Sequence, residues 1–347
     1  VISQAQIKTM IRKLLLFLPS IILQGILHLR HFLFDCGIFH SKKAPVKTIV
    51  IGNLAIGGAG KTPFADMLLR TIPSLNEVGF VSRGYGRKTK GPLSITHHST
   101  AADIGDEPLL IHRHHPEITG FVAEKRNVGI EKLLIQSPQI NCIVLDDALQ
   151  HRALRGDVNI LISKFDQPFY KDSLWPLGNL RDLKTRAKHV QAIAITNSPC
   201  DLSENEKNLI KEQIRFLTSA PVFFFHTEIL PIRSLWSPTE IPKNWGAFCG
   251  IAHPQPFFES LQKNYDVKEQ IAYADHQWLG EKEAQFLRSK LVTFGGPIEG
   301  WLTTEKDAMR IAHLESWKDI PVFYLPIITN INEADKEAWK QWLKKNI

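Results

Sequence analysis

The sequence contains few cysteines, and no two of them have the spacing of a metal site. Only four occur in 347 residues, at Cys36, Cys142, Cys200 and Cys249, and no C-x-x-C pair is present. This excludes a zinc site built from paired cysteines and is typical of proteins from a reducing compartment. We interpret all four side chains as packing residues.

Two further absences restrict the possible partners. A GTPase would carry Asn-Lys-x-Asp after the predicted strand 192–197, whereas this chain has Asn197-Ser198-Pro199-Cys200 there. Guanine specificity is therefore disfavoured. Lysine and arginine are dispersed, with no long basic stripe beside aromatic residues, so we expect no nucleic-acid partner. The net charge of +7 still favours an acidic partner, such as phosphate or an anionic membrane surface.

An uncharged stretch long enough to cross a membrane is also missing. From Leu14 to Leu29 the chain has no Lys, Arg, Asp or Glu, but this run has 16 residues and contains Pro19, whereas a spanning helix needs about 20. No small-residue cleavage site of a secretory signal follows it. Because basic residues flank the run, we expect residues 1–45 to form one or two helices in the membrane interface. A core helix packed on the next domain is the alternative, and a true span is less favoured than either.

The composition is that of a folded protein of about two domains, with 44% hydrophobic and 22% charged residues. Short apolar runs alternate with helical segments, which predicts an α/β fold with a second, smaller parallel-sheet domain. The phosphate-binding loop described next indicates that the first domain is of the P-loop NTPase type. We place the first domain at 46–220, a proline-rich linker at 221–243 and a smaller α/β domain at 244–347.

The run from Ala55 to Thr62 has the pattern of a phosphate-binding loop. A β-branched strand, 48–53, precedes it, and a helical segment with Pro63 in its first turn follows. Glycines let backbone N–H groups surround a polyphosphate, the lysine reaches its outer phosphates, and the threonine hydroxyl ligates Mg²⁺. The alternative is a glycine turn with a solvated lysine. The expected nucleotide-binding residues are Ala55, Ile56, Gly57, Gly58, Ala59, Gly60, Lys61 and Thr62.

Two pairs of acidic residues are candidates for the chemistry. Asp146 and Asp147 end an apolar strand, where carboxylates of P-loop enzymes lie near Mg²⁺. Asp106 and Glu107 stand just before a helix start. They could supply a general base or a metal-linked carboxylate, or they could simply cap that helix, and the spacing favours neither.

Two loops carry arginines that could clamp phosphate. One is Ser82-Arg83-Gly84-Tyr85-Gly86-Arg87, which follows a short strand, and the other contains Arg181. His276 lies on a further loop before a helical segment. Taken alone, each of these residues is better explained as part of a solvated or structural loop.

Together these segments resemble the tetraacyldisaccharide 4'-kinase family, the lipid A 4'-kinases. The similar stretches occur in the same order and cover most of the chain: GNLAIGGAGKTP (52–63), SRGYGR (82–87), GDEP (105–108), DDALQHR (146–152), PLGNLRD (176–182), FCGIAHP (248–254), ADH (274–276) and TTEKDA (303–308). Two departures are Ala148-Leu149, where the family usually has Gly-Phe, and Asp182, where it usually has Glu.

The resemblance implies transfer of the ATP γ-phosphate to the 4'-hydroxyl of a tetraacyldisaccharide 1-phosphate, at the cytoplasmic face of the inner membrane. It implies ATP and Mg²⁺ as cofactors and two α/β/α domains joined by a β linker. We expect a monomer that is peripheral or anchored through its N-terminus.

The resemblance also implies roles for individual residues. Lys61 and Thr62 would serve the ATP phosphates and Mg²⁺, and Asp106 would deprotonate the sugar hydroxyl with help from His276 of the second domain. Additional Mg²⁺ ligands would be Glu107, Asp146 and Asp147. Phosphate or substrate would be positioned by Arg181, Arg83, Tyr85 and Asn53.

Two other classes of protein remain as alternatives. A P-loop ATPase or GTPase acting as an assembly factor would need a Cys or His metal motif or a guanine-reading motif, and neither is evident. A nucleotide-gated membrane adaptor would show no ATP turnover that depends on a lipid disaccharide.

Overall fold

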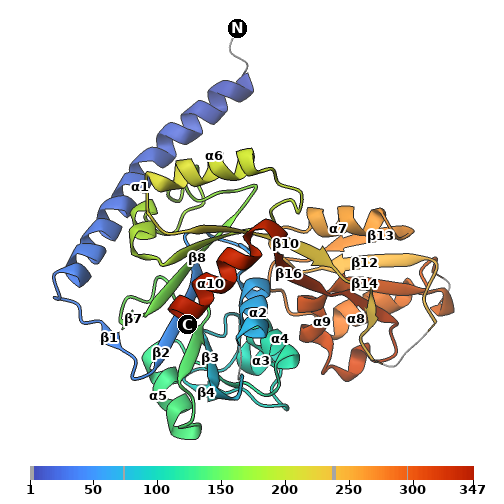
Figure 1. The fold of residues 1–347 in the computed structure, drawn as a ribbon. Coiled ribbons are helices and arrows are strands. Elements are labelled where there is room, and N and C mark those ends of the chain that lie inside the picture. Colours follow the sequence, from blue (N-terminus) through green and yellow to red (C-terminus); the bar gives the residue numbers. More distant parts are fainter. Residues whose placement is uncertain (1–3, 73–74, 237–239, 295) are drawn as a thin grey trace.

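The structure is a computed structural model that describes residues 4–72, 75–236, 240–294 and 296–347. The described residues form two large sheets flanked by helices, a separate two-stranded pair, and one long helix at the N-terminus (Figure 1). Residues 1–3 of the expected N-terminal region and 237–239 of the expected linker lie outside the described residues, as do 73–74 and 295 of the two expected domains. The α/β fold class is confirmed.

The first sheet has nine strands in the order β16-β10-β9-β8-β2-β6-β3-β5-β4. Its strands are parallel except β4 and β16, which pair antiparallel at the two edges. Strand β2 lies between β6 and β8 and is parallel to both, so the carboxyl ends of these central strands lie at the same edge of the sheet. The strands are β2 (Lys47–Asn53), β3 (Val78–Ser82), β4 (Leu93–Ser94), β5 (Thr119–Val122), β6 (Cys142–Leu145), β8 (Val158–Lys164), β9 (Ala192–Thr196), β10 (Val222–Ile229) and β16 (Ile327–Ile331).

Helices bury both faces of this sheet, which explains the unbroken Ile49-Val50-Ile51 run in β2. Ile49 and Ile51 pack with Phe64 of α2 in one core, whereas Val50 packs in another with Leu133 of α5. The helices of this part are α2 (Lys61–Thr71), α3 (Ala101–Ile104), α4 (Asp106–His114), α5 (Arg126–Gln136) and α6 (Glu204–Arg215).

The second sheet has five strands in the order β11-β15-β14-β12-β13. Four are parallel and β11 is an antiparallel edge strand, so the expectation of a smaller, mainly parallel sheet is confirmed. Its strands are β11 (Arg233–Ser234), β12 (Trp245–Cys249), β13 (Val267–Ala272), β14 (Gly300–Thr304) and β15 (Val322–Leu325). Its helices are α7 (Gln255–Gln262), α8 (Glu281–Ser289) and α9 (Glu305–Ile311).

The expected boundaries of the linker and of the second domain do not match the sheets to which their strands belong. β10 lies within the expected linker 221–243, but it pairs with β9 in the first sheet. The chain then builds the second sheet and returns, so β16 and α10 (Lys336–Asn346), expected in the domain 244–347, belong to the first. Trp339 of α10 explains this return, because its buried ring packs edge-on against Phe64 and Phe225 of the first core.

The N-terminal helix α1 (Gln4–Asp35) continues through Pro19 as a single helix along one side of the first domain (Figure 1). Large apolar side chains of α1 are exposed, among them Leu15, Leu18, Ile22, Ile26, Leu29 and Phe32. Only 17% of its most apolar stretch is buried, which contradicts the alternative of a packed core helix. By length and composition, the segment Leu15–Asp35 could also cross a membrane.

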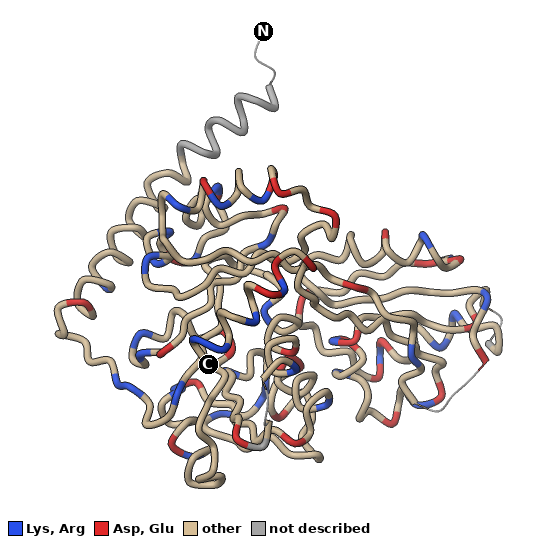
Figure 2. The backbone as a smooth tube through the Cα atoms, in the orientation of Figure 1, with Lys and Arg blue, Asp and Glu red and all other residues tan. Residues whose placement is uncertain are grey.

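Polar contacts hold α1 on the first domain. The Ser20 hydroxyl donates to the Leu174 carbonyl (3.1 Å), and Arg30 donates to the Gln150 carbonyl (2.7 Å). His31 is buried against Asp182, with 2.7 Å between Nε2 and Oδ1. Charged residues are few along the described part of α1 (Figure 2), and its exposed side chains are mainly apolar. A short parallel pair, β1 (Lys42–Lys43) with β7 (Leu154–Arg155), follows.

Candidate active site

The phosphate-binding loop lies between β2 and α2, as its sequence predicts. Gly57 and Gly60 have φ angles of 94° and 75°, in the left-handed region that favours glycine. The Thr196 hydroxyl donates to the Ala59 carbonyl (2.9 Å), and the Asn179 carbonyl accepts from the Ile56 amide (2.8 Å). The loop is thus fixed by its neighbours and presents the N-terminus of α2 at the carboxyl edge of the sheet.

Lys61 and Arg181 converge on the same two side chains. Lys61 Nζ donates to Asn53 Oδ1 (3.1 Å) and lies 3.7 Å from Asp147 Oδ1. Arg181 donates to Asn53 Oδ1 (2.7 Å) and forms a two-pronged ion pair with Asp147. Although burial acts to raise it, these two cations hold the pKa of Asp147 below its usual value.

Asn53 was expected to contact the substrate; in the structure its side chain is buried and forms hydrogen bonds with other residues of the chain. It is 1% exposed, its Oδ1 accepts from both cations, and its amide donates to the Ala55 carbonyl (2.9 Å). Asn53 therefore positions Lys61 and Arg181.

Asp146 is a buried carboxylate with almost no donors. It is 2% exposed, its Oδ2 is 3.5 Å from the Ser82 hydroxyl, and its Oδ1 has no hydrogen-bond partner among the described residues. Burial, followed by the negative charges of Glu107 and Asp147, raises the pKa of Asp146.

Arg126 is buried and stands at the start of α5. Its guanidinium donates to the main-chain carbonyls of Ala123 (2.9 Å), Asp146 (3.2 Å) and Asp147 (3.3 Å). It therefore fixes the turn that presents both aspartates. A single arginine at the end of a strand gives no sequence signal for this role.

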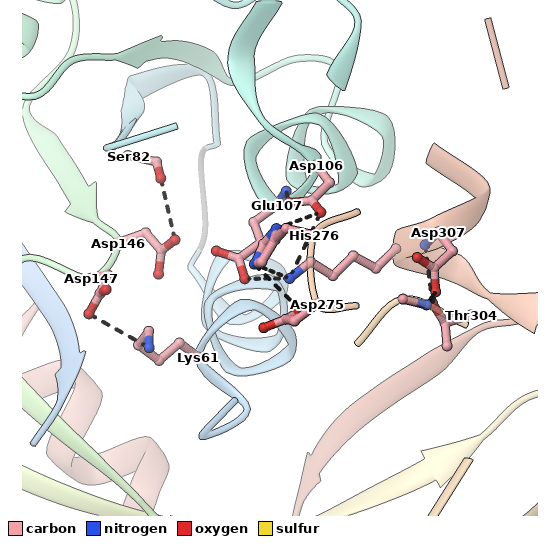
Figure 3. Close-up of polar contacts among 12 residues, drawn as sticks. Lys61, Ser82, Asp106, Glu107, Asp146, Asp147, Asp275, His276, Thr304 and Asp307 are labelled. Atoms are coloured by element: carbon pink, nitrogen blue, oxygen red, sulfur yellow. Dashed lines mark hydrogen bonds and ion pairs between the residues drawn. The ribbon is translucent and has the colours of Figure 1, made fainter. Parts of the chain in front are cut away.

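The second group of charges is centred on Asp106, which is 4% exposed at the start of α4 (Figure 3). His276 Nδ1 lies 3.2 Å from Asp106 Oδ2, so the structure brings the expected base and its expected partner together from the two parts of the molecule. Arg310 donates twice to the same oxygen, at 2.6 and 2.8 Å. Although burial acts to raise it, the bond from His276 and the charges of Lys306 and Arg310 hold the pKa of Asp106 well below its usual range.

Lys306 and Arg310 were not among the expected site residues, although Lys306 lies in the TTEKDA stretch. Both belong to α9, and Lys306 Nζ donates to Glu107 Oε1 (3.0 Å) and lies 3.3 Å from His276 Nε2. Arg310 is held by fully buried Asp307 (2.6 Å) and donates to the Gly250 carbonyl (2.8 Å). The sequence shows both cations on one predicted helix. Their partners, Glu107 and Asp106, lie about 200 residues away in the chain, so the sequence gives no sign of the contacts.

Tyr85 and Arg83, two of the expected substrate contacts, differ in their contacts and exposure. Tyr85 packs its ring edge-on against His276, with 4.8 Å between centroids, and remains 60% exposed. Arg83 is exposed on the same loop. His276 has a φ of 56°, an uncommon value for a non-glycine residue, so the loop holds the ring in a constrained backbone position.

The oxygen ligands present suit Mg²⁺ only together with phosphate. No group of three or more His, Cys, Asp or Glu side chains in the described residues could hold a metal ion by itself. Mg²⁺, however, is usually bound through one or two carboxylates plus substrate phosphates. The unpaired Asp146 Oδ1, the nearby Asp147 carboxylate and the Thr62 hydroxyl in the first turn of α2 fit that description.

A glycine loop that opens a helix, a lysine at the first position of that helix and a carboxylate pair directly after the neighbouring strand β6 define a P-loop phosphotransferase. The family model described as tetraacyldisaccharide-1-P 4'-kinase matches residues 12–347. The chain belongs to this family, and the expectation of an ATP-dependent lipid kinase is confirmed.

Relatives and a solved structure agree with this assignment. The chain is 35% identical to a tetraacyldisaccharide 4'-kinase of Flavobacterium psychrophilum, over 92% of this chain and 94% of that one. It is 33% identical to the enzyme of the same name from Bacteroides thetaiotaomicron, over 94% and 91% of the two chains. The "apo" form of LpxK from Aquifex aeolicus, solved in complex with ATP, superposes with a TM-score of 0.72 at 28% identity, covering 94% of this chain and 97% of that one.

Proposed function

We propose that the chain transfers the γ-phosphate of ATP to the 4'-hydroxyl of a tetraacyldisaccharide 1-phosphate, with Asp106 and His276 at the sugar hydroxyl. The observation that carries the assignment of roles is the contact between Asp106 of α4 and His276 of the second domain. Glu107 is the link to the nucleotide side, because its charge acts on Asp146 while its carboxylate accepts from Lys306.

Lys61 and Arg181 hold the transferring phosphoryl group. In the structure their charges are neutralised by Asp147 and oriented by Asn53. Both cations are therefore preorganised, and they need not be reoriented as negative charge moves during the reaction.

Asp106 orients the sugar hydroxyl and accepts its proton late. Its low pKa makes it a weak base, but phosphoryl transfer through a loose transition state requires little proton abstraction before bond formation. His276 Nδ1 lies within reach to share that proton. Because the pair spans two domains, the base is complete only when the domains are in contact, which limits futile ATP hydrolysis.

Thr62, Asp146 and Asp147 would hold Mg²⁺, with Glu107 close by, while Tyr85 and Arg83 would meet the substrate. The ion would neutralise charge on the phosphates during transfer. The exposed apolar side chains of α1 support a place at the cytoplasmic face of the inner membrane, where an anionic lipid substrate resides. We keep the monomer as part of this proposal.

The test is transfer of labelled γ-phosphate from ATP to a tetraacyldisaccharide 1-phosphate in detergent micelles with Mg²⁺. We expect a labelled lipid product that disappears in Lys61→Ala. Absence of a lipid product from the unaltered chain, with ATP still bound, would refute the proposed acceptor and would favour another membrane-bound one.

A further inference from the structure

A cavity of about 600 Å³ lies between the C-terminal end of α1 and strands β2 and β8. Phe34 and Asp35 of α1 line one side, and Val50 and Asn159 of the strands line another. Ala148 and Leu149, which directly follow Asp147, also line it. Its volume is in the range of pockets that take a small ligand. None of the roles proposed above uses it.

The lining of this cavity is strongly basic. It contains Arg152, Arg155, Arg186, Lys188 and His189. Its two acidic residues already have partners: Asp35 accepts from Arg152 (2.6 Å), and Asp157 pairs with Lys43 (2.8 Å) and Thr48. A surplus of positive charge therefore faces the cavity.

Arg152 and Arg186 differ in how they are held. Arg152 stacks on Phe34, 5.0 Å from the ring centroid, and donates to Asp35 and to the His31 carbonyl (3.0 Å). The half-buried Arg186 guanidinium makes no hydrogen bond or ion pair within the described part of the chain. Burial and the nearby charge of Arg152 lower the pKa of Arg186, and the charges of Asp182 and Asp35 offset this only in part, so this arginine is held at an energetic cost.

An anion in the cavity would offset that cost. A guanidinium presents a planar fork of donors that matches the oxygens of phosphate. We propose that this cavity binds a phosphate group carried by a lipid, with Arg186 and Lys188 as the direct donors and Arg152 as a fixed second charge.

The location favours a phosphate that arrives on a lipid. The C-terminal end of α1 lines the cavity, and apolar side chains are exposed along the same helix. Val50 lines the cavity and lies three residues before Asn53, about 10 Å along β2 from the residue that positions Lys61. If the proposed function holds, the 1-phosphate at the far end of the disaccharide has the right chemistry for this cavity; the phosphate of a bilayer phospholipid shares it.

The experiment compares Arg186→Gln and the milder Lys188→Gln with Arg215→Gln, a control at an exposed position in the last turn of α6. The first measurement is the KM for tetraacyldisaccharide 1-phosphate in neutral detergent micelles, beside the KM for ATP and kcat. We expect the lipid KM to rise about tenfold or more in Arg186→Gln, as for loss of one charge-assisted hydrogen bond. The KM for ATP and kcat should stay unchanged. The Tm should not fall, because Arg186 has no partner to lose.

Two arms distinguish the sources of the phosphate. With an acceptor that lacks the 1-phosphate, the variants and the unaltered chain should have the same KM if the cavity holds the substrate's own phosphate. A phospholipid site would instead leave the lipid KM in neutral detergent unchanged and weaken flotation with phosphatidylglycerol vesicles, but not with phosphatidylcholine vesicles.

If neither the KM nor the flotation of either variant differs from that of Arg215→Gln, the proposed site is wrong. Failure of the proposed function has a different signature, because the unaltered chain would then form no lipid product. The flotation arm would still test the cavity.

Discussion

Asp106 and Asp146 are two buried carboxylates of one active site with opposite surroundings. They are 4% and 2% exposed, so burial penalises the charge of both. Asp106 accepts from Arg310 and His276, whereas Asp146 has a distant hydroxyl as its only side-chain donor in the described residues, and the charges of Lys61 and Arg126 do not outweigh burial and the two neighbouring carboxylates. Their pKa values accordingly shift in opposite directions. The difference teaches that direct charged donors, and not the extent of burial, decide the direction of the shift.

The largest effect is expected from Asp106→Asn. The amide keeps the shape but cannot accept the hydroxyl proton, so kcat should fall about 10²–10⁴-fold, the usual contribution of a general base. ATP affinity should be unchanged, because Asp106 lies on the side of α9 and not on the phosphate loop. Steady-state kinetics and ATP calorimetry measure both, with the exposed Asp266→Asn as control. Near-normal turnover would remove Asp106 from the mechanism.

Asp146→Asn should raise the thermal stability of the ligand-free protein but lower its kinase activity. Because its pKa is raised to about 7, the unfolded state releases this proton first, and the unaltered chain loses stability as pH rises from about 4 to about 7. Without Mg²⁺ and ATP, the variant should lose this pH dependence. Its Tm at pH 8 should rise by about 1–2 °C for each kcal/mol regained, because the unfolding entropy scales with chain length.

With Mg²⁺ and ATP, the same variant should be less active, because a ligand for the ion is gone. Thermal unfolding with and without the nucleotide, beside the kinase assay, tests both statements. If the ligand-free variant had a lower Tm than the unaltered chain, the charge of Asp146 would not be destabilising in the folded protein, and the contrast with Asp106 would be wrong.

The smallest effect is expected at His114, which contacts a third buried aspartate, Asp66. Asp66 of α2 accepts from His114 Nδ1 (2.9 Å), whose Nε2 lies 3.0 Å from Glu305 of α9. The bonds to Asp66 and Glu305 raise the pKa of His114 to about 9. This histidine therefore stabilises the fold fully below about pH 6.5, and the stabilisation is lost as pH rises through about 9.

His114→Gln should flatten the fall in Tm between pH 7 and 9.5, whereas His98→Gln, at an exposed position, should not. Thermal unfolding over that pH range measures the difference. Equal pH profiles for His114→Gln and the unaltered chain would show that His114 is not charged in the folded state.

The phosphate loop and the carboxyl edge of the sheet could be predicted because their chemistry is local. Glycines, Lys61 and Thr62 are adjacent in sequence, and a strand that ends in Asp146-Asp147 belongs at the same edge. The contact of Asp106 with His276 was expected only through the family resemblance. Spacing alone left Asp106 equally explained as a helix cap.

The remaining features depend on contacts between distant segments. Lys306 and Arg310 contact Glu107 and Asp106, and the side chain of Asn53 accepts from both Lys61 and Arg181. Likewise β16 pairs with β10, and Trp339 of the following helix packs against Phe225 of β10, which no local pattern encodes.

That return of β16 has a consequence for biosynthesis on the ribosome. The ribosome makes the chain from its N-terminus at about 5–20 residues per second, so β10 emerges well before its antiparallel neighbour. About a hundred residues of the second domain must be synthesised in between, and during those seconds the edge of β10 is open to pairing with another nascent chain. Completion of the first sheet thus waits until residues 327–346 have been translated.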